Sequence, residues 1–325
     1  MIVPEAVRAA YGLAAEANQL GEGLTNETYL VRSLQSQAKL VLQSLNPVFG
    51  ASVNEDIDAI TTHLASAGLE TQRLVRAGNG ASSIRCDGKL WRVLSYVNGE
   101  SHGTWDNAVA LRSAGELVAR VHTVLRSCEH AFASERHAHD TNAHFERLRV
   151  RMRQPHPRRQ ALLPLAEAIV NADVPLWNNL PRRIIHGDLK LSNVLFVDER
   201  AIALVDLDTF QWSDIAIELG DACRSWCNPR GEDVADPVFR VDLYDAALAG
   251  YIEHAPWLTA AERACLRIAP IRIGLELASR FCLDAFEEAY FRWDPTRFES
   301  ASHHNEVRAR GQLHLARSAR TQLAD

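Results

Sequence analysis

The chain has 325 residues, with 35 Lys and Arg against 41 Asp and Glu and a formal net charge of −6 at pH 7. Hydrophobic residues make up 47% of the chain and charged residues 23%, which is typical of a folded globular protein and excludes a disordered chain or a small disulfide-stapled scaffold. Because acidic residues outnumber basic ones, the sequence offers no global basic field for a nucleic acid or a membrane surface.

Cysteine usage and hydropathy indicate the compartment. The six cysteines are scattered and form no Cys-x-x-Cys pair, which favours buried thiols in a reducing environment. The start, MIVPEAVRAAYGL, lacks a basic leader with an apolar run, and no apolar stretch approaches the roughly 18–20 residues that a membrane span needs. We therefore expect a cytoplasmic protein whose partner is a small molecule, with no nucleic acid and no membrane.

The N-terminal part of the chain alternates between strand patterns and one helix pattern. Residues 21–43 carry a Gly-rich turn and two apolar runs, which predicts a β-hairpin. Residues 53–67 carry apolar side chains at intervals of three and four before Gly68, which predicts an amphipathic helix with a glycine stop. Three more strand patterns, separated by GNG and DGK turns, occupy residues 71–97. The predicted order is therefore β-β-α-β-β-β.

Beyond residue 97 helix patterns dominate, and only residues 183–208 interrupt them with a small hairpin. The sequence therefore predicts an α+β fold, with a small antiparallel sheet lobe at 1–97 and a larger, mostly helical lobe at 98–325. We read the Arg-rich segment 149–159 as a solvated loop. Helices are predicted at 106–125, with one apolar stripe of Val109, Leu117, Val121 and Leu125, and at 161–172, 241–252 and 260–286.

The interrupting hairpin, RRIIHGDLKLSNVLFVDERAIALVDLD, carries the chemistry. A turn centred between Glu199 and Arg200 would place Asn193 opposite Asp206. Directly paired side chains have Cβ atoms roughly 4.5–5.5 Å apart, so an amide oxygen and a carboxylate would converge at the mouth of the hairpin. Mg²⁺ takes a few such hard oxygen ligands together with waters and substrate phosphates. The pair therefore predicts a divalent-metal site.

A second carboxylate precedes this pair. Asp188 lies five residues before Asn193, in a loop headed by His186 and Gly187, and the resulting H-x-D-x-K-x-x-N followed 13 residues later by D-x-D is the pattern of a kinase catalytic loop. An aspartate there can accept or orient the proton of an incoming hydroxyl. The pattern predicts phosphoryl transfer; the alternative is that Asp188 only forms a turn and Asn193 only caps a strand.

The motifs HGDLKLSNVLF and LVDLDTF resemble the aminoglycoside phosphotransferase and choline kinase superfamily. Within it, KLVLQSLN, LVDLDTF, ELGDACRS and SRFCLDAFEEAYF resemble the N-acetylhexosamine 1-kinase branch most closely. The resemblance implies a protein-kinase-like bilobal fold, ATP and Mg²⁺ as cofactors, and a sugar hydroxyl as acceptor, such as the anomeric hydroxyl of an N-acetylhexosamine. The same fold serves aminoglycosides, choline, homoserine and methylthioribose, and fold alone does not choose among them.

The resemblance also assigns roles to residues of the loop. It implies Asp188 as the catalytic base, Asn193 and Asp206 as Mg²⁺ ligands, and Asp208 as a neighbour of the metal or the substrate. Lys190 is expected to contact the γ-phosphate, with a solvent-facing side chain as the alternative.

One position departs from the kinase pattern. Gln43 stands where kinases of this fold usually carry a strand lysine that pairs with the α- and β-phosphates. Glutamine can donate a hydrogen bond to a phosphate but brings no charge. Either Mg²⁺ and other donors compensate, or the protein is a nucleotide-binding pseudokinase. Glu55 and Asp58, the candidate helix partners of such a lysine, are read as solvated surface charges.

Further nucleotide contacts are expected from the small lobe and the stretch between the lobes. Gly21 and Gly23 flank a turn whose amides could approach phosphates, although Gly-x-Gly is also an ordinary hairpin turn. Thr28 follows and is predicted to face the nucleotide. Tyr96 and Val97 are expected beside the adenine.

The remaining candidates concern the substrate and the support of the loop. Asn26 and Arg280 are predicted substrate contacts, the latter from a match to the branch's R-F-x-x-D segment; its alternative is a plain ion pair with Asp284 one helical turn later. His186 is expected to orient the loop through its ring nitrogens. Asp221 is predicted to anchor the loop from below, and Glu218 is the rival for that role.

Overall fold

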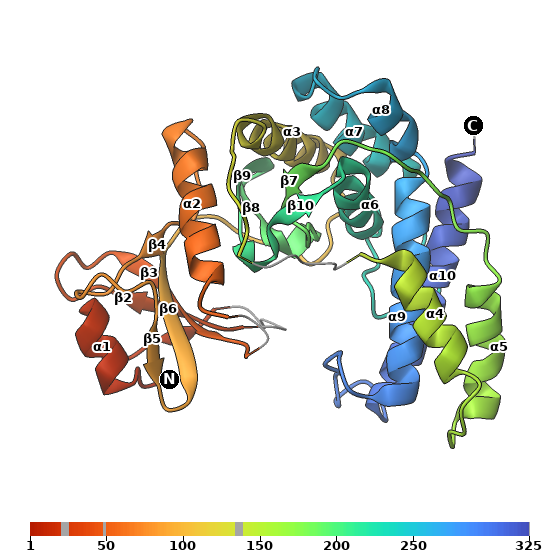
Figure 1. Cartoon of the computed structure of the whole chain (residues 1–325), viewed down its shortest axis with the longest axis horizontal. Coiled ribbons are helices and arrows are strands. Elements are labelled where there is room, and N and C mark those ends of the chain that lie inside the picture. Colours follow the sequence, from red (N-terminus) through yellow and green to blue (C-terminus); the bar gives the residue numbers. More distant parts are fainter. Residues whose placement is uncertain (21–25, 48–49, 134–138, 325) are drawn as a thin grey trace.

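An antiparallel sheet forms the small lobe of the protein (Figure 1). The computed structural model describes residues 1–20, 26–47, 50–133 and 139–324. The strand order is β1-β2-β3-β6-β4, and β5 also pairs with β6. The elements are α1 (Glu5–Tyr11), β1 (Asn18–Gln19), β2 (Glu27–Arg32), β3 (Lys39–Leu45), α2 (Val53–Ser66), β4 (Leu74–Val75), β5 (Ile84–Cys86) and β6 (Lys89–Ser95).

Both faces of this sheet are covered. Because successive strand residues point to opposite faces, Leu42 packs with Val7 of α1 in one cluster while Val41 packs with Ile57 of α2 in another. Burial on both sides explains why β3 and β6 read as nearly continuous apolar runs. The polar Gln43 lies two residues after Val41 and therefore shares the face that α2 covers.

The large lobe is mostly helical and holds the two short sheets that carry the catalytic loop (Figure 1). In chain order it contains α3 (Ala108–Leu125), α4 (Thr141–Arg151), α5 (Arg159–Val170), β7 (Arg183–Ile185), the 3₁₀ turn η1 (Leu191–Asn193), β8 (Val194–Val197), β9 (Arg200–Leu204), the 3₁₀ turn η2 (Leu207–Thr209), β10 (Gln211–Ser213), α6 (Ile215–Trp226), α7 (Val241–His254), α8 (Ala260–Leu266), α9 (Ala269–Glu287) and α10 (Ala301–Gln322).

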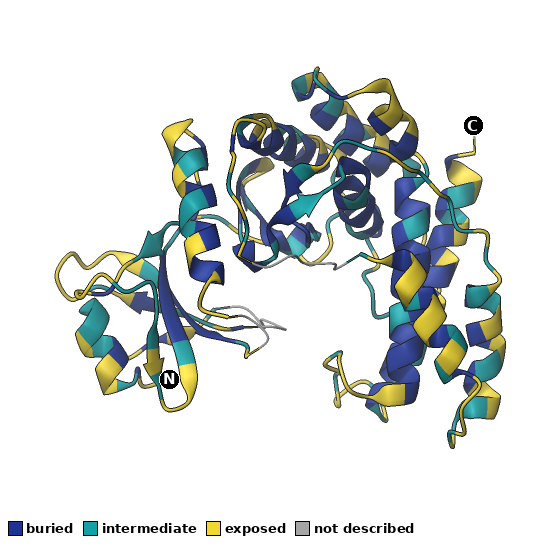
Figure 2. Cartoon of the chain, viewed as in Figure 1, coloured by how far each residue is buried: buried dark blue, intermediate teal, exposed yellow. Residues whose placement is uncertain are grey.

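Helix α9 is the centre of the large lobe. It packs against α10, α6, α4 and α5, and Figure 2 shows it buried along most of its length. A helix that is apolar nearly all round belongs in a core. Several neighbouring helices begin at side-chain caps that the sequence supplies, because a cap satisfies backbone donors that the helix itself leaves unpaired. These caps are Asn107 for α3, Asp140 for α4, Asp214 for α6, the Thr259–Glu262 capping box for α8 and Ser300 for α10.

The helix predictions need four corrections. The segment expected as one helix over 260–286 is two, because Pro270 is tolerated only in a first turn and α9 begins beside it. Val109 is 61% exposed, so it is not part of the buried stripe of α3. The start of the Arg-rich segment 149–159 lies in α4, and its end in α5, with the loop confined between them. Helices α1, α4 and α10 were not predicted; the exposed face of α10 is rich in arginine and its apolar period is weak.

The sequence predicted no apolar stretch long enough to span a membrane. Among the described residues, none of the helices combines the length and the apolar character that crossing a bilayer requires.

Helices α3 and α7 cross with their backbones in contact. A Cβ atom at Gly250 would lie 2.0 Å from the carbonyl oxygen of Arg112, and one at Gly115 would lie 2.0 Å from the carbonyl oxygen of Ala247. Real Cβ atoms do not approach backbone so closely, so glycine at both positions is what permits this crossing.

We expect Gly250→Ala to lower the free energy of unfolding by about 2 kcal/mol or more, because the clash outweighs the roughly 1 kcal/mol that alanine gains over glycine in a helix. Chemical denaturation measures the change. The matched control is Gly103→Ala, which adds the same methyl group where no atom lies within 4 Å and should change stability by less than about 0.5 kcal/mol. Equal stability of the two variants would contradict the close crossing.

Candidate active site

Strands β8 and β9 form the predicted hairpin with a different register. Val194 pairs with Leu204 and Val197 with Arg200, so the turn is centred one residue earlier than expected, and a bulge follows Leu195. Asn193 therefore lies opposite Val205, whose amide donates to its carbonyl at 2.9 Å, and not opposite Asp206. The side chains of Asn193 and Asp206 still extend from the same end of the hairpin. The bulge was not readable from the sequence, because the alternation of side chains does not fix where an extra residue is accommodated.

The loop before the hairpin makes a sharp turn at Gly187. Its φ of +83° is in the left-handed region, and a Cβ there would lie 2.6 Å from the carbonyl oxygen of Thr209. Glycine is the residue that satisfies both constraints. The ring Nε2 of His186 lies 2.9 Å from the carbonyl oxygen of Val205, which ties the loop to the end of β9. This contact fits the orienting role predicted for His186.

Glu218 of α6 anchors the loop, and Asp221 does not. The backbone amides of His186 and Gly187 donate to the two oxygens of Glu218 at 2.7 and 2.9 Å. Asp221 instead accepts from the guanidinium of Arg224, at 2.9 Å from Nη2. Both acids lie on α6, and the prediction chose the one that pairs with Arg224 instead of the one that binds the loop amides.

A buried network supports Glu218. His122 of α3 contacts Glu218 through Nε2 at 3.2 Å and Tyr251 of α7 through Nδ1 at 2.8 Å. Burial by itself would raise the pKa of Glu218, but the hydrogen bond and charge of His122 outweigh it and hold the pKa below its ordinary value. Glu218 is therefore an ionised acceptor, the state that two backbone donors require.

Two residues of the loop donate to the carboxylate of a third, Asp188. Lys190 Nζ donates to Asp188 Oδ2 at 3.0 Å, and Asn193 Nδ2 donates to Asp188 O at 2.7 Å and to Oδ2 at 3.3 Å. Burial opposes ionisation of Asp188, but the positive charge and hydrogen bond of Lys190 lower its pKa overall. Lys190 has a raised pKa, since the charges of Asp188 and Asp206 outweigh its own desolvation. Asp188 is thus an ionised acceptor held in a fixed orientation.

Asp206 adopts a left-handed backbone conformation with φ 62°, just after β9. Burial and the neighbouring charges of Asp208 and Asp188 raise its pKa, so the site concentrates negative charge. Its carboxylate makes no hydrogen bond with another side chain in the described part of the molecule. Because Asn193 uses its Nδ2 toward Asp188, its Oδ1 is left for another partner.

These oxygens fit a divalent cation. The described residues contain no group of three or more His, Cys, Asp or Glu side chains that could hold a metal. A cation here would take the Asp206 carboxylate and the Asn193 amide oxygen and complete its shell with substrate and water oxygens, as Mg²⁺ does. It would also offset the repulsion among the acidic residues.

Asp208 is enclosed by the small lobe instead of facing a substrate. Its side chain is fully buried and accepts from Arg92 on β6 and from Nδ2 of Asn26 at 2.7 Å. Asn26 accepts in turn from the amide of Asn46 at 2.9 Å. The predicted substrate contacts of Asn26 and Asp208 are therefore replaced by a contact between the two residues.

Sequence reasoning missed Arg92. It pairs directly with Gln43 across β3 and β6, and its guanidinium donates to Gln43 Oε1 at 2.6 and 2.8 Å. Gln43 also donates to Thr28 Oγ1 at 3.0 Å. The available signal was a single charged residue inside the apolar run LWRVLSYV, at a position that the sheet buries.

The other predicted nucleotide contacts lie around the start of the segment between the lobes. Val97 is buried and Tyr96 half-buried, with Lys39 Nζ 5.1 Å from the centre of its ring. Just beyond, Glu100 and Phe196 exchange two backbone hydrogen bonds of 2.8 Å, which attaches the connecting segment to β8. The remaining pair, Gly21 and Gly23, falls outside the described residues.

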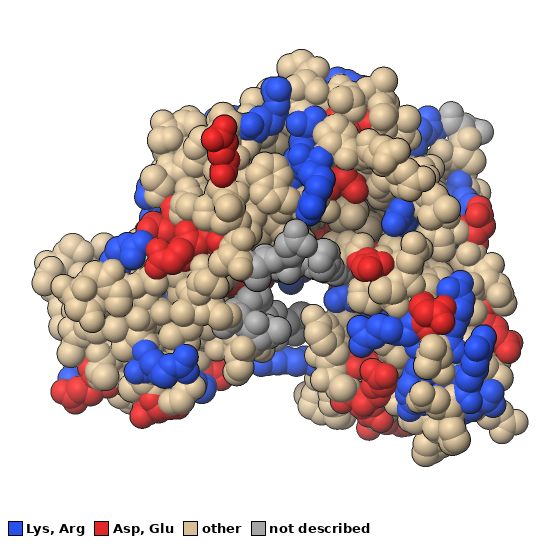
Figure 3. Space-filling view, in the orientation of Figure 1, with Lys and Arg blue, Asp and Glu red and all other residues tan. Residues whose placement is uncertain are grey.

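Arg280 lies beside a hollow of about 250 Å³ at the end of α9. Its guanidinium is 5.7 Å from the ring centre of Phe291, and it makes no ion pair with Asp284. Asp284 instead accepts from the backbone amides of Ala289, Tyr290 and Phe291 and shapes the turn after α9. The segment after α9 lies on the side of the large lobe that faces the small lobe, where Figure 3 shows the surface hollowed. The hollow is lined by His144, Arg147, Arg280, Leu283, Asp284, Glu287, Tyr290 and Phe291.

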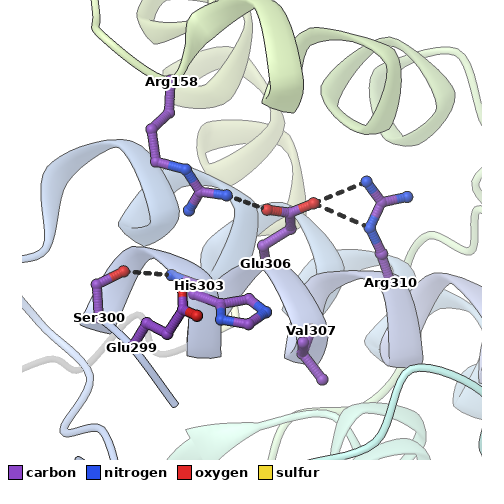
Figure 4. A pocket seen from close by; sticks show the side chains of 7 residues that line it. All are labelled: Arg158, Glu299, Ser300, His303, Glu306, Val307 and Arg310. Carbon is purple, nitrogen blue, oxygen red and sulfur yellow. Dashed lines mark hydrogen bonds and ion pairs between the residues drawn. The ribbon is translucent and has the colours of Figure 1, made fainter.

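A second hollow, of about 580 Å³, contains none of the loop residues. Its two arginines are already paired, since Glu306 binds both Arg158 and Arg310 (Figure 4). It offers no combination of acid, amide and cation for chemistry. Its lining residues are Arg158, Glu299, Ser300, His303, Glu306, Val307 and Arg310.

Comparisons with known proteins agree with this geometry. The model of the phosphotransferase enzyme family matches residues 16–257. A homoserine kinase from Rhodopseudomonas palustris is 24% identical over 255 residues, which cover 76% of this chain and 72% of that protein. A homoserine kinase from Methylorubrum populi is 28% identical over 194 residues, which cover 58% and 56%. These relatives do not confirm the predicted N-acetylhexosamine 1-kinase branch.

Solved structures show the same fold. An aminoglycoside phosphotransferase from Alicyclobacillus acidocaldarius superimposes with a TM-score of 0.65 at 16% identity, covering 100% of this chain and 97% of that one. The amicoumacin kinase hAmiN, in complex with AMP-PNP and Ca²⁺, gives 0.66 at 12% identity, covering 95% and 91%. The predicted kinase-like bilobal fold is confirmed.

Glu218→Gln should lower the free energy of unfolding at pH 7 by about 1–3 kcal/mol, because an amide donor would meet a backbone donor of the loop. The advantage of the natural protein should shrink as pH falls through the ordinary glutamate range near about 4.3, since a carboxyl with a lowered pKa stabilises the fold above that range and stops doing so once protonated. Thermal melts from pH 7 to 3 measure both effects, because the loss continues below the ordinary value down to the lowered pKa of Glu218. The same substitution at exposed Glu55 is the control and should change stability little.

Proposed function

Because this chain belongs to the phosphotransferase enzyme family, we propose that it is a kinase that transfers the γ-phosphate of ATP to a hydroxyl group of a small molecule. The observation that carries the proposal is the arrangement of the loop. An ionised, oriented Asp188 lies beside Asn193 at the mouth of the hairpin from which Asp206 extends. Phosphoryl transfer needs this combination of an aspartate for the acceptor and oxygen ligands for a metal.

The proposed roles follow from the contacts. Mg²⁺ on Asn193 and Asp206 would neutralise charge on the β- and γ-phosphates. Asp188 accepts a hydrogen bond from the acceptor hydroxyl and aims its oxygen at the γ-phosphorus. As the new P–O bond forms and the bond to ADP breaks, the hydroxyl proton passes to Asp188. Lys190 keeps Asp188 ionised and is proposed to contact the γ-phosphate as well.

The nucleotide would lie between the lobes. Tyr96 and Val97 are proposed to border the adenine, and Thr28 and Gln43 are proposed to approach the phosphates, together with Gly21 and Gly23. The amicoumacin kinase of similar fold, solved with AMP-PNP and Ca²⁺, supports a nucleotide and a divalent cation as ligands. The complete catalytic loop favours a kinase over the pseudokinase that Gln43 alone would indicate.

Two acceptors merit testing first. Homoserine is favoured by the names of the curated relatives and by the hollow beside Arg280, where cationic and acidic side chains lie together and suit a molecule with both a carboxylate and an ammonium group. A sugar hydroxyl, such as that of an N-acetylhexosamine, is favoured by the motifs LVDLDTF and ELGDACRS. Both acceptors offer the hydroxyl that Asp188 would orient.

The acceptor is tested by ADP release from Mg·ATP with homoserine, N-acetylhexosamines, neutral hexoses, choline, methylthioribose and an aminoglycoside. ADP release that depends on one of these compounds supports the kinase and identifies its class of acceptor. Nucleotide binding without release for any of them would favour a pseudokinase.

Asp188→Asn should reduce turnover with the active acceptor by about 10²–10⁴-fold, because the amide cannot accept the hydroxyl proton. Binding of Mg·ADP, measured by calorimetry, should stay within a factor of a few, since Asp188 is not a proposed metal ligand. Asp140→Asn, at the cap of α4, is a control of identical chemistry outside the loop. A variant at position 188 that keeps full turnover would refute the role of Asp188.

Lys190→Met should move the acid limb of the kcat–pH profile to higher pH. The charge of Lys190 lowers the pKa of Asp188, so its removal leaves burial to raise that pKa, and activity is then lost sooner as the pH falls. Lys190→Arg keeps the charge and should leave the limb near its natural position. An acid limb unmoved in the Met variant would show that Lys190 does not set the ionisation of Asp188.

A further inference from the structure

A buried ion pair joins the two lobes beside the proposed metal site. Arg92 of β6 in the small lobe and Asp208 of η2 in the large lobe meet through two hydrogen bonds, Nη1 to Oδ1 at 2.5 Å and Nη2 to Oδ2 at 2.7 Å. Both side chains are completely inaccessible to solvent. A forked contact of this kind fixes relative orientation as well as distance.

Every donor of Arg92 is used inside the protein. Besides its two bonds to Asp208, Nε and Nη2 donate to Gln43 Oε1, and Nη1 donates to Asn54 Oδ1 of α2 at 3.2 Å. A guanidinium has five N–H donors, and these five bonds account for all of them. Arg92 therefore has no donor left for a nucleotide phosphate, unlike the strand lysine whose place Gln43 occupies.

Residues from four parts of the small lobe thus gather around the Arg92–Asp208 pair: Arg92 and Asn26 contact the carboxylate, and Gln43 and Asn54 contact Arg92. Arg92 comes from β6, Gln43 from β3, Asn54 from α2, and Asn26, which also donates to Asp208, precedes β2. In protein kinases a strand lysine and a helix glutamate must pair before the site is assembled. Here the helix acids Glu55 and Asp58 bind Arg76 at the surface instead.

We propose that Arg92 and Asp208 are a positioning pair that holds the small lobe against the metal-binding segment and so sets the Asp206 carboxylate. The inference rests on the proposed kinase function. Asp206 lies two residues before Asp208, at the start of a single 3₁₀ turn, so fixing Asp208 restricts the backbone that presents Asp206. In this protein the cation of the pair is Arg92 of β6, and the acid is Asp208 of the large lobe, not an acid of α2.

The first test needs no ligand and no activity. Hydrogen exchange of the ligand-free protein is compared among the natural chain, Arg92→Met and Asp208→Asn. Backbone amides of both variants should exchange about 10-fold or more faster over 204–210 and over β6. Each substitution leaves the other residue of the pair buried without an opposite charge. Arg76→Met, which removes only exposed ion pairs, is the matched control and should match the natural protein. Unchanged exchange over 204–210 in both variants would overturn the proposal.

The second test separates positioning from direct phosphate binding. Calorimetry measures ADP with Mg²⁺ and ADP with EDTA. Both variants should bind Mg·ADP about 10-fold or more weakly than the natural protein, while their affinity for ADP in EDTA should change less than threefold. The double variant should bind Mg·ADP no more weakly than the more impaired single variant, since the two residues act as one unit. If Arg92→Met alone weakens ADP in EDTA, Arg92 is a phosphate ligand and the pair has no positioning role.

Two further variants keep the proposal testable if a buried charge left alone prevents folding. Arg92→Lys keeps the charge but loses the fork, and Asn26→Ala removes one hydrogen bond to Asp208; both should give smaller changes of the same kind. If the natural protein does not bind Mg·ADP, the proposed function fails, while the exchange experiment still decides whether the pair holds the segment.

Discussion

The catalytic loop depends on one buried carboxylate beneath it. Glu218 receives the amides of two successive loop residues and is itself held by His122. Two backbone donors that converge at one place need an ionised acceptor when water is excluded, and leaving them unpaired would be costly. The direction in which Asp188 points is therefore set by α6 and α3, although the loop's own sequence determines what Asp188 can do.

A second acid performs the corresponding task on the other side of the site. Asp208 is enclosed by Arg92, Asn26 and their neighbours, which attaches the segment containing Asp206 and Asp208 to the small lobe. In the same way, Glu218 attaches the catalytic loop to the large lobe. Asp188 and Asp206, proposed to bind the acceptor and the metal, belong to the two segments that these buried acids hold. This division accounts for the number of acidic residues here: the buried ones hold the backbone, and the other two are proposed to face the substrates.

The sequence predicted the part of the site that is local. Asp188, Lys190 and Asn193 lie within six residues, and their spacing in a loop is enough to bring them together. Arg92 could not be found in this way, because its partner Gln43 is 49 residues away and the pairing depends on the register of β3 and β6.

The errors of the sequence analysis have the same origin. The register of the β8–β9 hairpin was wrong because of a bulge after Leu195. Choosing Asp221 over Glu218 was wrong because two acids three residues apart on a helix differ only in what lies opposite each of them. The β-β-α-β-β-β order of the small lobe and the helices α2, α3, α5 and α7 were predicted correctly, since their apolar periods reflect burial directly.

The attachment of the connecting segment to β8 has a consequence for how the lobes move. Glu100 exchanges two hydrogen bonds with Phe196 and so belongs mechanically to the large lobe, whereas Ser95 is still paired with Leu40 in the small one. The four residues between them are then the whole length of backbone over which a rotation of one lobe against the other can be distributed. Tyr96 and Val97, proposed to border the adenine, fall within those four residues. Occupying the nucleotide site and setting the angle between the lobes would therefore involve the same torsion angles.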